Sequence, residues 1–251
     1  MRKTVCVLVV AMLILHTALM AMVYASTPDV EQHVFIYYIK GAKPKPPSTG
    51  TGYYKLLGAK WKALPVKIEV NPANYYGLSE EFVMKAIGLA AGEWDDGAYS
   101  QSDSDASTTW TGVSVDLIYD TITVTNKGYD DLAWDSGKLD GANTIVWGNY
   151  PEQGVIAITI IWSSRVTKEI LEFDMVLDTD FTWGNATEKG NAVMDLQNIV
   201  THELGHGLGL GDVYLTAANQ ETMYGYAAYG ETIKRSLYNG DMAGITKLYG
   251  T

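Results

Sequence analysis

Cysteine is nearly absent from the chain, which has a single one, Cys6, among 251 residues. Disulfide bonds within the chain therefore cannot stabilise the fold, which must rely on a core or on a bound metal. Charged residues are also few, 19% against 47% hydrophobic residues, and this excludes a disordered chain. Basic residues are the scarcer charge, 18 against 29 acidic ones, so we expect no nucleic-acid partner.

The start of the chain has the composition of an export signal. Arg2 and Lys3 form a short basic start, residues 4–23 are almost wholly apolar, and Ala25 ends a cleavage-site pattern. We therefore expect residues 1–25 to be a signal peptide and the protein to be secreted to the extracellular space. The apolar run approaches the ~20 residues that cross a bilayer, so a membrane anchor through residues 4–23 is the alternative.

Residues 26–52 are interpreted as an N-terminal segment followed by a proline-rich linker. Three prolines, Pro44, Pro46 and Pro47, fall within Lys43–Gly50, where they favour an extended, unpacked chain. The preceding stretch, His33–Ile39, is rich in apolar and aromatic residues. It fits either an additional strand or a short pro-segment, and the sequence favours neither.

The remaining chain has the pattern of one mixed α/β domain. β-branched and aromatic runs predict strands, and apolar residues at helical spacing predict helices. The expected strands are 64–70, 113–124, 144–147, 155–162 and 170–177. The expected helices are one capped by Ser79 and running to Trp94, one over about 192–208, and one over about 239–249.

The chemistry is concentrated in the second predicted helix. His202 and His206 are four residues apart, which places both imidazoles on one face of a helix where they can bind the same ion. Two imidazoles and a carboxylate suit zinc and leave a fourth position for water. Glu203 lies beside them and can act as the general base.

The third metal ligand is less constrained by spacing. Gly209 can adopt a positive φ and reverse the chain, which would bring Asp212 back to the ion. Asp212 could also be an ordinary exposed loop acid. Glu221 or Glu231 would replace it if the ligand set followed other proteins with the same two-histidine motif.

These residues resemble the metzincin metallopeptidases, and among them the matrixin-like branch. The family pattern is H-E-x-x-H-x-x-G-x-x-H/D, and His202, Glu203, His206, Gly209 and Asp212 match it position by position. Most matrixins have histidine at the last position, so the aspartate is similar to the variant of snapalysin-type bacterial peptidases. The resemblance implies a zinc endopeptidase that acts on proteins or peptides.

Further matches extend the resemblance to residues 53–251, which we expect to be the catalytic domain. Met223 and its neighbours resemble the Met-turn, and the segment 239–250 resembles the C-terminal helix of matrixins. The implied fold is of the α+β (mixed α/β) class, a twisted sheet of about five strands with an active-site helix, a Met-turn and a C-terminal helix. The implied state is a monomer. A cysteine-switch pro-segment and a second, structural zinc site are not expected.

Three expectations concern substrate, calcium and the competing function. An extended substrate would pair with an edge strand, for which Val155–Trp162 is the candidate. Calcium is a weaker expectation, resting on the acidic residues Asp103, Asp105, Asp174, Asp178 and Asp180. The alternative function is a zinc-binding surface or interaction protein that retains the fold without catalysis.

Overall fold

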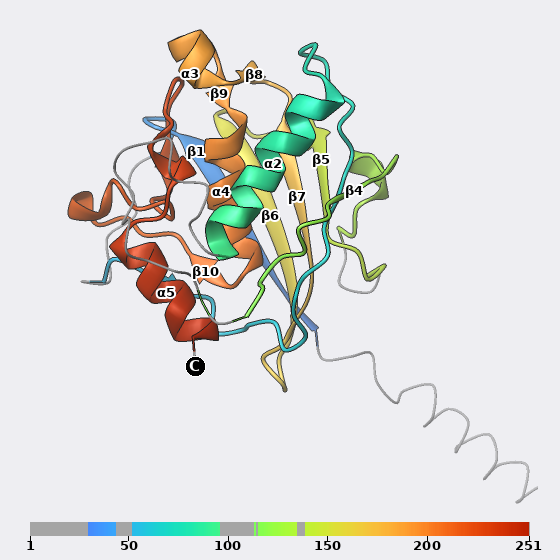
Figure 1. Ribbon diagram of the computed structural model, residues 1–251, viewed down its shortest axis with the longest axis vertical. Helices are drawn as coiled ribbons and strands as arrows, with labels where there is room; N and C mark the ends of the chain where they lie inside the picture. The colour runs from blue at the N-terminus through green and yellow to red at the C-terminus, as the bar shows by residue number, and fades with distance from the viewer. Residues whose placement is uncertain (1–29, 44–51, 96–112, 114, 135–138, 251) are drawn as a thin grey trace, which may run out of the picture.

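The computed structural model describes residues 30–43, 52–95, 113, 115–134 and 139–250. Its centre is a twisted sheet with α2 and α4 packed on one face (Figure 1). The strands of this sheet are β1 (Val30–Ile39), β3 (Glu69–Val70), β4 (Thr123–Val124), β5 (Thr144–Gly148), β6 (Val155–Ser164), β7 (Ile170–Asp178) and β11 (Tyr226–Ala227). The α-helices are α2 (Glu80–Asp95), α3 (Ala186–Lys189), α4 (Leu196–Gly207) and α5 (Asn239–Tyr249).

The strand order is β11-β1-β6-β7-β5-β3-β4. The strands β7, β5, β3 and β4 are parallel to one another, whereas β6 runs antiparallel to both β7 and β1. The expected α+β sheet of five strands corresponds to β6, β7, β5, β3 and β4. Two further strands, β1 and β11, extend it beyond β6. The predicted fold class is confirmed.

The predicted edge strand is wrong. Residues 155–162 lie within β6, which pairs with β7 on one side and with β1 on the other. The pairing with β1 runs from Val30 opposite Ser164 to Tyr38 opposite Val155, so it covers the whole strand. The apolar pattern of β6 reports that its residues are buried, but it carries no information about which strand lies beside it. The segment 30–39 is thus an additional strand of the sheet.

Local signals located the helices well. The hydroxyl oxygen of Ser79 accepts a hydrogen bond from the backbone N–H of Phe82 (3.1 Å) at the start of α2, and α5 has the predicted bounds. The start of α4 differs from the prediction, because Asp195 caps the helix by accepting from the N–H of Asn198 (2.9 Å). The two residues before the helix form β9 (Met194–Asp195), which pairs with β8 (Trp183–Gly184).

Two of the predicted strands are much shorter in the structure. Of the predicted strand 64–70 only the last two residues, β3, belong to the sheet, and of 113–124 only the last two, β4. An isolated bridge also joins Val66 to Ile118. The carboxylate of Asp95 accepts the backbone N–H groups of Leu117 and Ile118, so these groups bind a side chain instead of a neighbouring strand. Within the ranges that the structure describes, none of the helices is long and apolar enough to cross a membrane.

Candidate metal centre

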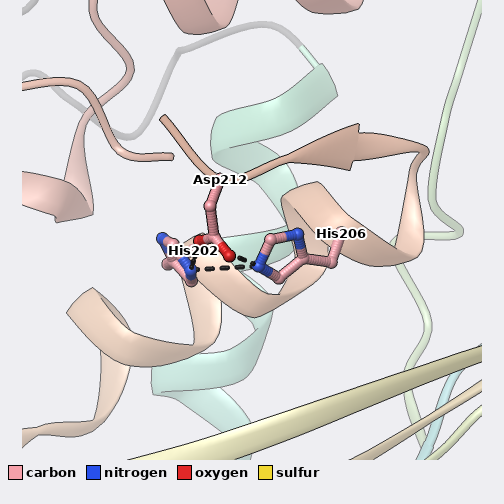
Figure 2. Close-up of side chains that lie close together, drawn as sticks. All are labelled: His202, His206 and Asp212. Carbon is pink, nitrogen blue, oxygen red and sulfur yellow. Dashed lines mark hydrogen bonds and ion pairs between the residues drawn. The ribbon is translucent and has the colours of Figure 1, made fainter. Parts of the chain in front are cut away.

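The helix α4 and the turn that follows it bring three side chains together. His202 and His206 lie one turn apart on α4, and the chain reverses at Gly209, which has φ = 101°. A Cβ atom at Gly209 would lie 2.6 Å from the carbonyl oxygen of Ala59, so the close approach of the two backbones also requires glycine. The next residues form β10 (Leu210–Gly211), which pairs with β2 (Lys55–Leu56) and directs Asp212 back over α4 (Figure 2).

The ligand atoms converge on one point. The Nε2 atoms of His202 and His206 are 3.1 Å apart, and Oδ1 of Asp212 lies 3.3 Å and 3.5 Å from them. The Nδ1 atoms face the carbonyl oxygens of Thr222 (2.7 Å) and Leu210 (2.9 Å). A carbonyl can only accept, so each Nδ1 carries the proton and each Nε2 presents a lone pair. Two lone pairs and a carboxylate oxygen that face one another form an arrangement that can hold a cation.

The spacing and the donor types fit zinc. A tetrahedral zinc ion with ligands at about 2.0–2.2 Å separates neighbouring ligand atoms by roughly 3.3 Å. The three observed separations, 3.1, 3.3 and 3.5 Å, agree with this edge length. Oδ1 of Asp212 is also buried without a hydrogen-bond partner among the described residues, as expected of an oxygen reserved for an ion. The cluster can therefore hold a metal ion.

Electrostatics favour the metal-binding protonation states of His202 and Asp212. Burial lowers the pKa of His202 to about 4, so its imidazole is neutral. For Asp212, burial alone would raise the pKa, but the adjacent imidazoles of His206 and His202 lower it well below its usual range. The pKa of His206 is raised, because the adjacent Asp212 carboxylate outweighs the effect of burial, so a metal ion would have to displace a proton there. Neutral imidazole and ionised carboxylate are the forms that ligate a divalent ion.

Glu203 occupies a buried position beside the cluster. Its side chain is fully buried, and its Oε2 accepts a hydrogen bond of 2.5 Å from the hydroxyl of Thr159 on β6. The other oxygen, Oε1, has no hydrogen-bond partner among the described residues. Burial raises the pKa of Glu203 to about 7, where a carboxyl group can exchange a proton with water.

Sequence reasoning missed Thr159, although it is the one hydroxyl-bearing residue in the apolar run from Val155 to Trp162. It also missed two aromatic residues of β1. The ring of Phe35 stacks on His206 with 4.0 Å between centroids, and the ring of Tyr37 stacks on His202 at 3.7 Å. No local signal could assign them, because β1 reaches the histidines only through strand pairing.

Met223 lies beneath α4 and is fully buried. The helix has Gly205 at this point, where a Cβ atom would collide with Sδ of Met223 and with the ring of Trp94. The turn is held by Asp241 on α5, whose carboxylate accepts the backbone N–H groups of Thr222 (2.6 Å) and Met223 (3.0 Å). Met223 thus packs against α4 at Gly205, between the positions of the two histidines in the sequence.

The competing ligands have other partners. Glu221 accepts the backbone N–H groups of Gly240 and Asp241 (2.9 and 3.2 Å), and Glu231 forms an ion pair with the buried Lys234. Among the residues that the structure describes, the one group of three or more histidine, cysteine or acidic side chains able to hold an ion is His202, His206 and Asp212.

The calcium candidates are placed only in part. Asp174 accepts the backbone N–H groups of Ala133 and Thr144, both at 3.1 Å. Asp178 accepts those of Tyr150 and Asp180. These bonds tie β5 and nearby loops to β7, and calcium binding stays a prediction. Asp103 and Asp105 lie outside the described residues.

The comparison with known families agrees with this geometry. Residues 153–250 match the family model described as matrixin, a segment that runs from β6 to α5 and contains the whole metal cluster. No curated protein matches the chain closely enough to name as a relative. The expected resemblance to matrixin-like metallopeptidases is confirmed, and the match supports a metallopeptidase that acts on proteins or peptides.

Proposed function

We propose that the protein is a secreted zinc-dependent endopeptidase in which His202, His206 and Asp212 hold the ion and Glu203 is the general base. The observation that carries this proposal is the convergence of two imidazole lone pairs and one carboxylate oxygen, 3.1 to 3.5 Å apart, next to a buried acid on the same helix turn. The aspartate as third ligand is the feature shared with snapalysin-type peptidases.

Zinc would supply a Lewis acid that polarises the peptide carbonyl and lowers the pKa of water. The chain itself handles the proton. Glu203 would take a proton from the attacking water on its free Oε1 and return it to the leaving amine, while Thr159 holds Oε2 in place. Thr159 is thus a positioning residue, because it acts through Glu203. Met223 supports α4 from below and keeps both histidines in register.

Secretion rests on the composition of residues 1–25, with residues 26–52 as an N-terminal segment and linker and residues 53–251 as the catalytic domain. The expected substrates are proteins or peptides in extended conformation. Calcium remains a secondary expectation, and the expected oligomeric state is a monomer.

A Glu203→Ala variant separates the enzyme from a non-catalytic zinc-binding protein. We expect it to keep one zinc ion per chain and to lose hydrolysis of casein. Hydrolysis at the normal rate by this variant would refute the assigned base.

The third ligand is tested separately, by measuring the number of zinc ions per chain in the variants Asp212→Ala, Glu221→Ala and Glu231→Ala. Only the first is expected to lose the ion. Retention of zinc by Asp212→Ala would exclude Asp212 as a ligand.

A further inference from the structure

The metal cluster and the base are closed off from solvent. His202 and Glu203 are 0% exposed, His206 is 1% exposed, and the side chain of Asp212 is 10% exposed. A peptidase must admit water and a length of peptide to its metal ion. In this conformation neither can reach the histidines, so a covering element has to leave before catalysis.

The covering element is β1. Tyr37 lies flat on His202 with the two rings 2° from parallel, and Phe35 lies on His206 with the rings 11° from parallel. Tyr37 is 1% exposed, and its hydroxyl is buried without a hydrogen-bond partner among the described residues. A strand that served only to complete the sheet would not need two aromatic rings on the two metal-binding imidazoles.

The register of β1 places its backbone beside the proposed base. Phe35 is opposite Thr159 in the antiparallel pairing with β6, and Tyr37 is opposite Ala157. Thr159 is also the residue that holds the base, Glu203. The backbone of residues 35–37 therefore runs past the base along a strand edge, as a peptide does when it binds by strand addition.

The strand β1 is less deeply buried than its neighbour β6, although it pairs with β6 along its whole length. Of its ten residues only Tyr37 is buried, whereas nine of the ten residues of β6 are buried. On its other side β1 pairs with β11 through only two register positions, Tyr38 with Tyr226 and Ile39 with Ala227. Release of β1 would expose one fully buried residue, Tyr37, together with partly buried apolar residues such as Phe35, Ile36 and Ile39, and β6 would become the edge strand.

We propose that Val30–Ile39 is an internal inhibitor that occupies the peptide-binding edge of β6 in the manner of a substrate and must leave before a substrate can bind. The inference rests on the proposed function and deepens it. The surface that β1 vacates fits an extended peptide with aromatic side chains at two alternate positions, like Phe35 and Tyr37, which stack on the two metal-binding imidazoles.

The first test removes the stacked rings in the full-length chain by Phe35→Ala with Tyr37→Ala. The control is Val34→Ala, since this residue of the same strand is 49% exposed. Zinc capture by a coloured chelator is measured in a Glu203→Ala background, so that the readout is independent of activity. We expect at least a tenfold faster loss of zinc in the double variant and no change in the control. Equal rates in all three chains would overturn the inference.

The second test locks β1 in place and does not depend on how well the first variant folds. Val34 and Ile160 are register partners, so Val34→Cys with Ile160→Cys, in a chain that also carries Cys6→Ser, can join β1 to β6. We expect the oxidised chain to lose zinc at least tenfold more slowly than the reduced chain, and to leave casein intact. The control is the unmodified chain with the same reductant. Equal zinc loss by oxidised and reduced chains would overturn the inference.

The third test concerns the kind of peptide. The receptor is the chain that carries Phe35→Ala, Tyr37→Ala and Glu203→Ala. We expect a labelled peptide with the sequence of residues 30–39 to bind it with a Kd at least tenfold lower than that of a peptide in which alanine replaces both aromatic residues. Equal affinities would overturn the aromatic preference. If the released chain holds zinc, keeps Glu203 and still fails to cleave casein, the proposed peptidase function fails, whereas the zinc-loss rates still decide the role of β1.

Discussion

The hydrogen bond between Thr159 and Glu203 allows a quantitative test of the assigned base. Thr159→Val keeps the shape of the side chain and removes the hydroxyl that donates to Oε2 at 2.5 Å. A hydrogen bond to a charged group contributes about 2 kcal/mol, and 1.36 kcal/mol corresponds to one pKa unit, so the pKa of Glu203 should rise by about 1.5. Burial already raises this pKa to about 7, and the variant would bring it to roughly 8.5.

The expected loss therefore depends on pH. With these two pKa values, the ionised fraction of Glu203 at pH 7 falls about 16-fold, whereas at pH 10 it barely changes. The assay is kcat/KM for a fluorogenic peptide between pH 5 and 10, with zinc content measured in parallel. A bound cation lowers both pKa values together, so the separation between the two pH profiles is the quantity to compare.

Thr159→Ser is the control, because it keeps the hydroxyl and should retain the profile of the unmodified chain. A Thr159→Val profile that is lower by the same factor at every pH would refute the reasoning, since a proton-transfer role predicts recovery at high pH. Loss of zinc from Thr159→Val would also contradict the reasoning, because Thr159 is proposed to act only through Glu203 and not on the metal ligands.

Three further predictions concern stability. Gly205→Ala should lower the free energy of unfolding by about 1–3 kcal/mol in a urea titration, because the added methyl group would collide with Met223. The control is Gly88→Ala on α2, where the added methyl group faces open space and should not be destabilising. Burial raises the pKa of Glu172 to about 7, so this carboxyl costs stability as pH rises from about 4.5 to 7. Glu172→Gln should therefore stabilise the chain at pH 8 by at most about 3 kcal/mol and not at pH 4, and equal gains at both pH values would contradict this. Zinc added to the chelated protein at 1,000 times its Kd should raise stability by about 4 kcal/mol, seen as a higher melting temperature, and an unchanged melting temperature would exclude a folded-state metal site.

The helical parts of the site were predictable because their signals are local. Residues four apart on a helix share one face whatever surrounds them, so His202 and His206 could be paired from spacing alone. Gly209 could be expected at a reversal because few other residues tolerate a positive φ, and the structure has φ = 101° there. The bounds of α5 followed from the same kind of local pattern.

The start of α4 was predicted too early, because the apolar residues before it continue the helical pattern. In the structure Met194 and Asp195 pair with Trp183 and Gly184, eleven residues earlier, and this pairing replaces the first turn of the predicted helix. The role of Thr159 was equally hidden, since its partner is 44 residues away in the chain.

The sequence by itself determined the candidate ligand types, their spacing and the class of the fold, because helix periodicity and turn chemistry act over a few neighbouring residues. Only the tertiary structure decided what lies on β6. Strand pairing joins residues more than a hundred positions apart, Phe35 with Thr159 among them, and an apolar strand fits many neighbours equally well. That non-local choice turns the segment 30–39, which the sequence left open, into the strand that covers the two histidines of the candidate metal cluster.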